Sequence, residues 1–127
     1  MELRGVSEGR PGLVLVNRQT AQTISSSVEV AATRRTRRRG LLGRDAMDPS
    51  EALILSPCFA IHTAFMRFAI DVIFVDARGR VLKIVCELPP WRLAIAPRAH
   101  AVIELAAGSL KARELKVGDS VELAPAA

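Results

Sequence analysis

Residues 71–88 read DVIFVDARGRVLKIVCEL, two apolar runs joined by a short polar stretch. Runs rich in Val, Ile and Phe are typical of β-strands, and the intervening Asp76-Ala77-Arg78-Gly79 is typical of a tight turn. Gly79 can adopt the positive φ that such a turn requires. The stretch therefore predicts a β-hairpin with strands over Val72–Asp76 and Arg80–Leu88.

Short apolar runs separated by turn residues continue on both sides of this hairpin. They predict further strands at residues 13–16, 23–30, 52–55, 58–63, 93–96, 101–105 and 121–123. Residues 31–42 are rich in helix-forming Ala, Arg and Leu, and Gly40 and Gly43 mark their end, which predicts a helix of about ten residues. A second short helix is predicted at residues 110–115.

The order of these elements predicts a mainly-β fold. About seven or eight short strands with one or two short helices are typical of a β-sandwich or a jelly-roll-like barrel. Strands do not alternate regularly with helices, as they do in parallel α/β sheets. A chain of 127 residues and 13.7 kDa has the size of one domain. We expect a flexible N-terminal tail over residues 1–11 and a single β-sandwich domain over residues 12–127.

The positive charge of the chain is concentrated in the predicted helix. The chain has 18 Lys and Arg against 13 Asp and Glu, a net charge of +5. Five arginines match this excess and are the candidate anion-binding residues: Arg34, Arg35, Arg37, Arg38 and Arg39. They form either a solvated helix face or a surface for an acidic or nucleic-acid partner. A nucleic acid is disfavoured because base-stacking aromatic residues are absent from this region, the first being Phe59.

The sequence also gives an expectation for where in the cell the protein is located. The apolar span 59–75 is interrupted by polar and charged residues, so no membrane-spanning helix is predicted. The first twelve residues lack the apolar core of a signal peptide. These features predict a cytoplasmic protein in which Cys58 and Cys86 remain reduced thiols.

Segment 58–71 holds the densest group of chemically active residues. His62 and Asp71 could pair, with the carboxylate fixing the imidazole tautomer for general-base catalysis and Cys58 or Thr63 acting as nucleophile. That arrangement predicts a small hydrolase. The structural alternative is that His62 and Thr63 bond the backbone of a half-buried strand while Asp71 caps a turn.

No metal and no cofactor are predicted. A helix would align Cys58, His62 and Met66 as ligands for a soft metal ion. The strand-like surroundings instead separate Cys58 from His62 by about 13 Å. The chain has two histidines and contains no phosphate-binding loop, dinucleotide glycine fingerprint, paired CxxC or HExxH motif.

Trp91 is the single tryptophan, and it follows two prolines and precedes Arg92. An exposed Trp beside an Arg suits stacking on a sugar or a base, while the alternative is a buried loop anchor. The leading functional hypothesis is a non-catalytic module that binds a small polar or sugar-like ligand. Its candidate ligand-binding residues are His62, Thr63, Met66, Arg67, Asp71 and Trp91. A hydrolase and an Arg-rich interaction protein are the alternatives, and enzymatic activity stays an open question.

Glu104 stands between two apolar residues, Ile103 and Leu105, in a predicted strand. A carboxylate in this position either faces solvent or is buried with a partner such as Arg or His. The pattern leaves both alternatives open.

Blocks distributed along the chain resemble the uncharacterised family called domain of unknown function 192. They are residues 39–44, 61–63, 70–76, 102–105 and 116–119, together with Cys58, Met66, Gly79 and Trp91. The resemblance covers residues 12–123 and implies a jelly-roll-like β-sandwich with a helix laid against it. It names no reaction, although His62, Thr63, Asp71 and Trp91 match the family's motif. Many members carry an N-terminal export signal, from which this chain departs.

Overall fold

The structure is a computed structural model that describes residues 8–9 and 12–126. Most of the expected tail, residues 1–11, therefore lies outside the described residues. Two residues of this expected tail, Glu8 and Gly9, are described. The Glu8 carboxylate accepts hydrogen bonds from the backbone N–H groups of Ala32 and Thr33. Gly9 pairs with Val30 through two backbone hydrogen bonds of 2.9 and 2.6 Å.

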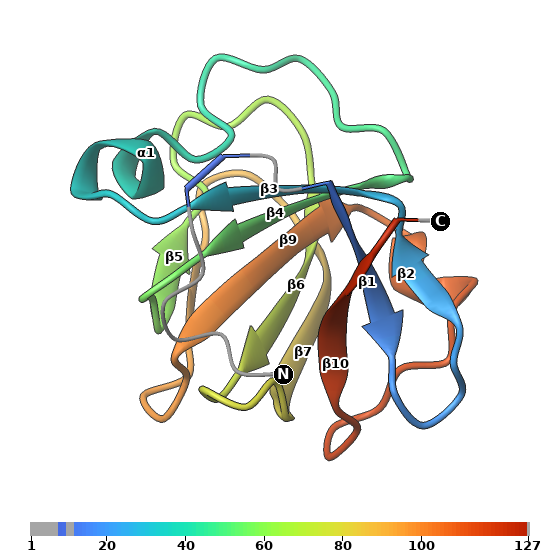
Figure 1. Cartoon of the computed structure of the whole chain (residues 1–127). Helices are drawn as coiled ribbons and strands as arrows, with labels where there is room; N and C mark the ends of the chain where they lie inside the picture. The colour runs from blue at the N-terminus through green and yellow to red at the C-terminus, as the bar shows by residue number, and fades with distance from the viewer. Residues whose placement is uncertain (1–7, 10–11, 127) are drawn as a thin grey trace.

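A five-stranded sheet forms the centre of the molecule (Figure 1). Its strands follow the order β3 (Ser27–Ala31), β4 (Glu51–Leu55), β9 (Ala101–Ala106), β6 (Ile70–Val75) and β7 (Val81–Leu88). Only β3 and β4 run parallel among these neighbours. Strands β6 and β7 form the predicted hairpin. The central strand β9 is buried along its whole length, so its alternating side chains enter two different interiors.

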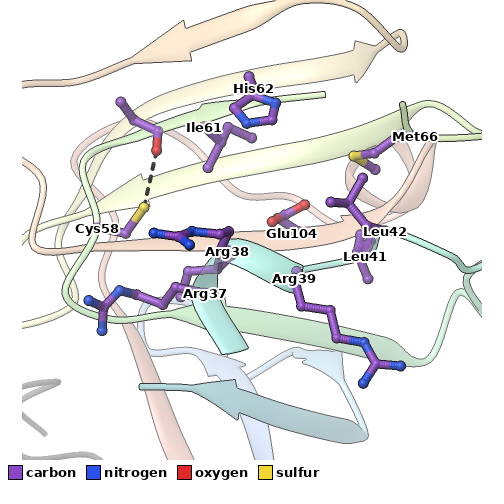
Figure 2. A pocket seen from close by; sticks show the side chains of 13 residues that line it. Arg37, Arg38, Arg39, Leu41, Leu42, Cys58, Ile61, His62, Met66 and Glu104 are labelled. Atoms are coloured by element: carbon purple, nitrogen blue, oxygen red, sulfur yellow. Dashed lines mark hydrogen bonds between the residues drawn. The ribbon is translucent and has the colours of Figure 1, made fainter. Parts of the chain in front are cut away.

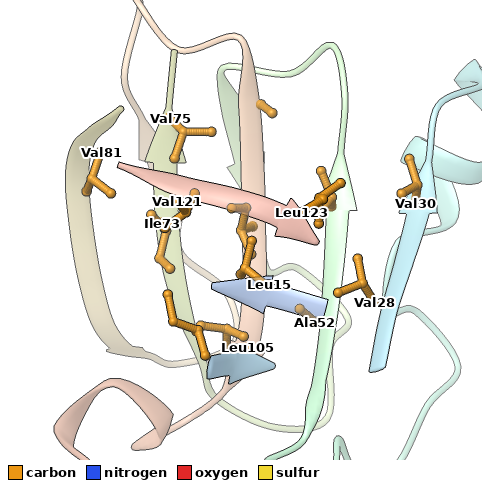
Figure 3. Close-up of a cluster of buried hydrophobic side chains, with 14 of the residues drawn as sticks. Leu15, Val28, Val30, Ala52, Ile73, Val75, Val81, Leu105, Val121 and Leu123 are labelled. Atoms are coloured by element: carbon orange, nitrogen blue, oxygen red, sulfur yellow. The ribbon is translucent and has the colours of Figure 1, made fainter. Parts of the chain in front are cut away.

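One interior lies between the central sheet and a three-stranded sheet. This second sheet has the order β10 (Val121–Pro125), β1 (Leu13–Asn17), β2 (Thr23–Ser25). Leu15, Val121 and Leu123 of the small sheet pack against Ile73 and Leu105 of the central one (Figure 3). Burial of these aliphatic side chains is the main force that holds the two sheets together.

The opposite face of the central sheet is covered by other segments. These are a two-stranded sheet, β5 (Ala60–His62) with β8 (Leu93–Ile95), and the chain that follows helix α1 (Arg34–Arg39). Leu41, Ile61 and Met66 from this layer pack against Val72 and Phe74 of the sheet. The described chain contains ten strands, one α-helix and one 3-10 helix, η1 (Ser109–Lys111). The mainly-β fold is confirmed, and among the described residues the three sheets stay separate rather than closing into one barrel.

The predicted strand 23–30 is wrong in one respect, because the chain divides it between two sheets. Strand β2 ends at Ser25 and β3 begins at Ser27. The backbone N–H groups of Ser26 and Ser27 both donate to the carbonyl of Ser50, and the Ser25 hydroxyl donates to the same oxygen. These bonds turn a corner that the alternation of Ser, Val and Ile does not reveal.

Helix α1 has six residues, fewer than the ten that the composition predicts. It begins with a capping box between Thr33 and Thr36 and ends at Gly40, whose φ is 47°. The second predicted helix is reduced to the single turn of η1. Neither segment has an apolar stripe long enough to stabilise further turns.

The close approach of Gly79 to β10 gives a test of the hairpin. Gly79 has a φ of 90°, and a Cβ there would collide with the carbonyl oxygen of Val121. Gly118 has a φ of 96° with open space around it. We expect Gly118→Ala to cost about 1–2 kcal/mol of stability from backbone strain alone. Gly79→Ala should cost at least about 2 kcal/mol more, because the backbone must also move. Urea unfolding of both variants measures the difference, and equal losses would contradict the close approach.

Candidate functional site

A cavity of about 260 Å³ lies on the face of the central sheet that α1 and β5 cover. Figure 2 shows its lining, which combines apolar, cationic and acidic side chains. Leu41, Leu42, Leu55, Ile61 and Met66 form the apolar walls. The polar lining comes from Arg37, Arg38, Arg39, Cys58, His62 and Glu104.

Glu104 is the buried polar group of this cavity. It lies on β9 between Leu53 of β4 and Val72 of β6, and it is 4% exposed. Its carboxylate forms no hydrogen bond or ion pair with any residue that the structure describes. Burial without a compensating partner raises the pKa of Glu104 to about 7. Of the two alternatives drawn from the sequence, the buried carboxylate is the one observed. No Arg or His among the described residues is its partner.

The arginine cluster reaches the cavity with three of its five members. In Figure 2 the guanidinium groups of Arg37 and Arg39 point to opposite sides, and Arg38 extends toward the side of Cys58. Arg37 donates to the carbonyl oxygen of Ala32 at 2.6 Å. Arg34 and Arg35 lie outside this cavity, on a neighbouring hollow that Arg38 and Arg39 also line. The cavity rim is therefore cationic while its floor carries an acid.

Cys58 and His62 both line the cavity, and the Cys58 thiol is hydrogen-bonded to the backbone rather than to His62. The Cys58 thiol donates to the carbonyl oxygen of Ala60 at 3.2 Å. Burial raises the pKa of this thiol, with Glu104 adding to the effect. His62 is exposed at the rim, opposite Leu93 of β8. A thiol with a raised pKa is a poor nucleophile, because the thiolate is the reactive form.

Asp71 lies on the other face of the central sheet from the cavity. It shares the face of Ile73 and Val75, whereas Glu104 faces the cavity. Its two carboxylate oxygens accept hydrogen bonds from the backbone N–H groups of Glu87, at 2.8 Å, and Leu110, at 2.9 Å. The structure therefore does not bring Asp71 to His62, and the carboxylate holds β7 and η1 in place instead.

The Thr63 side chain is also held by hydrogen bonds to the backbone. Its hydroxyl donates to the carbonyl oxygen of Pro89 at 2.7 Å and accepts from the backbone N–H of Arg92 at 2.9 Å.

The other candidate ligand-binding residues lie in different places. Arg67 forms a surface ion pair with Asp45. Trp91 is exposed and contacts the ring of Phe65, with 4.6 Å between ring centroids. Of the six predicted ligand-binding residues, the cavity is lined by His62 and Met66.

The described residues contain no cluster of three or more His, Cys, Asp or Glu side chains that could hold a metal ion. Both cysteines carry free thiols, Cys58 half-buried and Cys86 exposed. None of the helices in the described part of the chain is long and apolar enough to cross a membrane.

Residues 14–123 match the model of the family DUF192, described as "Uncharacterized ACR". The chain belongs to DUF192. A UPF0127 protein of Pyrococcus abyssi is 34% identical to it over 116 residues, which cover 86% of this chain and 96% of that protein. A UPF0127 protein of Pyrococcus furiosus is 38% identical over 64 residues, or 50% of this chain and 54% of that protein. The family predicted from the sequence blocks is confirmed.

Two solved structures resemble this DUF192 protein in fold. A protein from Sinorhizobium meliloti 1021, whose description suggests a transcription regulator, has a TM-score of 0.80 at 22% identity and covers 93% of this chain and 96% of its own. A protein of unknown function from Novosphingobium aromaticivorans has a TM-score of 0.77 at 21% identity, covering 96% and 91%. At such identities the likeness shows the fold, and function must be argued from the site.

The buried carboxylate predicts an inverted pH dependence of stability. The pKa of Glu104 is about 7 in the folded state, whereas in the unfolded chain it has the ordinary value of 4.5. Stability should therefore fall as the pH rises between these values, by up to about 3 kcal/mol. We expect Glu104→Gln to remove this fall and to be more stable than the parent protein at pH 8.

Urea unfolding at pH 5 and pH 8 measures this effect. Glu114→Gln is the matched control, because Glu114 is exposed. The control should follow the parent protein at both pH values. A Glu104→Gln variant with the same pH dependence as the parent would show that the carboxylate is not desolvated in the folded state.

Proposed function

We propose that this DUF192 protein is a non-catalytic module that binds a small polar, sugar-like ligand in the cavity between α1 and β5. The observation that carries the proposal is Glu104, a buried carboxylate that faces the cavity without a partner among the described residues. An unpaired buried polar group is unfavourable, and a ligand hydroxyl that donates to it would remove that cost.

The rest of the lining fits such a ligand. The apolar side chains of Leu42, Ile61 and Met66 can pack against the C–H faces of a sugar ring. Arg38 and Arg39 at the rim add donors and positive charge, which suit a ring that carries hydroxyl, carboxylate or phosphate groups. A cavity of about 260 Å³ has room for at least one such ring.

Binding is favoured over hydrolysis by the state of the candidate nucleophiles. The pKa of Cys58 is raised rather than lowered. The hydroxyl of Thr63 is already engaged with two backbone groups. Asp71 lies across the sheet, so it cannot orient His62 as a general base.

A thermal-shift screen with monosaccharides, sugar acids and sugar phosphates tests the proposal. We expect at least one class to raise the melting temperature with increasing concentration, because a ligand that binds the folded state alone stabilises it. Glu104→Leu keeps a similar volume but removes the acceptor, so it should abolish the shift. Glu114→Leu is the control at an exposed position and should keep it. No shift with any class, or an unchanged shift in Glu104→Leu, would contradict the proposal.

A further inference from the structure

A second feature of the surface lies beside the cavity and takes no part in it. Four large apolar side chains are exposed on β8 and on the loops next to it: Phe65, Trp91, Leu93 and Ile95. Phe65 and Leu93 are each 72% exposed, and Trp91 is 60% exposed. We call these four residues the apolar patch. The rings of Phe65 and Trp91 contact each other, and Leu93 and Ile95 share the exposed face of β8. Large exposed apolar patches on a protein mark interaction sites.

The backbone holds the two aromatic residues of the patch in unusual positions. Phe65 and Trp91 both have a φ of 65°, a conformation that bulky residues rarely adopt. Backbone bonds fix it, since Trp91 N–H donates to the carbonyl of Thr63, and Thr63 N–H donates to the carbonyl of Arg92. The exposed ring pair is therefore built into the fold, and strain of this type is typical of functional surfaces.

Positive charge flanks the apolar patch across the cavity. Leu93 lies opposite His62, which lines the rim, and Phe65 adjoins Met66 in the cavity wall. Arg38 and Arg39 line the same cavity from α1, which lies next to β5 in Figure 1. Within the described chain, Arg34, Arg35, Arg38 and Arg39 form no ion pair with an acidic residue. The cationic helix and the apolar patch thus border one region of the surface.

We propose that this surface, the apolar patch together with the arginines of α1, docks on a membrane that contains anionic lipids. Trp and Phe rings favour the boundary between lipid headgroups and acyl chains, and arginines nearby bind the anionic headgroups. Leu93 and Ile95 add aliphatic side chains, which suit acyl chains better than they suit the stacked bases of a nucleic acid. The contact is peripheral, and it does not depend on Glu104 or on the ligand proposed above.

The emission of Trp91 reports directly on this contact, because it is the single tryptophan of the chain. The probes are vesicles of phosphatidylcholine alone and of phosphatidylcholine mixed with phosphatidylglycerol. With the mixed vesicles we expect a blue shift of the emission and protection from acrylamide quenching. Neutral vesicles should produce neither change, and added salt should weaken the binding to mixed vesicles.

Paired charge variants test the role of α1. Arg34→Gln with Arg35→Gln removes two charges without touching the cavity, and Arg78→Gln with Arg98→Gln removes two at other exposed positions. The first pair should lower the partition coefficient for mixed vesicles about thirty-fold, and the second pair should have little effect. Glu104→Leu should bind vesicles as the parent protein does. Because the same variant should lose the ligand-induced thermal shift, the membrane proposal and the ligand proposal can fail independently.

Vesicle flotation tests the apolar patch. Phe65→Asn with Trp91→Asn keeps residues that tolerate the left-handed backbone but removes both rings. Leu93→Ser is a milder second variant on the exposed face of β8. Both should float less with mixed vesicles. The proposal is overturned if the parent protein does not bind mixed vesicles, binds neutral vesicles equally well, or binds RNA but not vesicles. It is also overturned if Leu93→Ser floats with mixed vesicles as much as the parent protein does.

Discussion

Strand β9 is buried on both faces, and the two interiors of the molecule are built against it. One set of its alternating side chains, including Ile103 and Leu105, packs against the three-stranded sheet, while Val102 packs into the opposite interior. Glu104 belongs to that second set, so its carboxylate enters an interior formed by α1, β5 and their loops. The raised pKa of Glu104 and the presence of an acid in the cavity lining follow from this single register position.

The central sheet contains two buried carboxylates, Asp71 and Glu104, which differ in their hydrogen bonding. Asp71, on β6, has both oxygens bonded to backbone N–H groups and so joins β7 to η1. Glu104, next to it in the sheet but on the other face, has no such donors among the described residues. The first arrangement stabilises the fold, whereas the second leaves the carboxylate oxygens of Glu104 without a donor among the described residues.

The sequence could predict the hairpin β6–β7, the mainly-β class and the family, because these depend on local patterns of apolar and turn residues. The corner at Ser26 and the site were harder to predict. Alternation places Asp71 and Glu104 in strands but does not say which segment covers each face. The donors to Asp71 come from Glu87 and Leu110, far along the chain. Among the described residues, the lack of donors at Glu104 likewise depends on how α1 and β5 pack, and no short sequence motif indicates that packing.

The titration of the Glu104 carboxyl carbon can be followed by NMR in protein with ¹³C-labelled glutamate, with the signal assigned through Glu104→Gln. We expect a midpoint near the pKa of about 7, because the carboxyl group is desolvated by burial. A midpoint near the ordinary value of 4.5 would show that the carboxylate is hydrated or paired in the folded protein. That result would contradict the conclusion that the fold presents to the cavity an acid without a partner among the described residues.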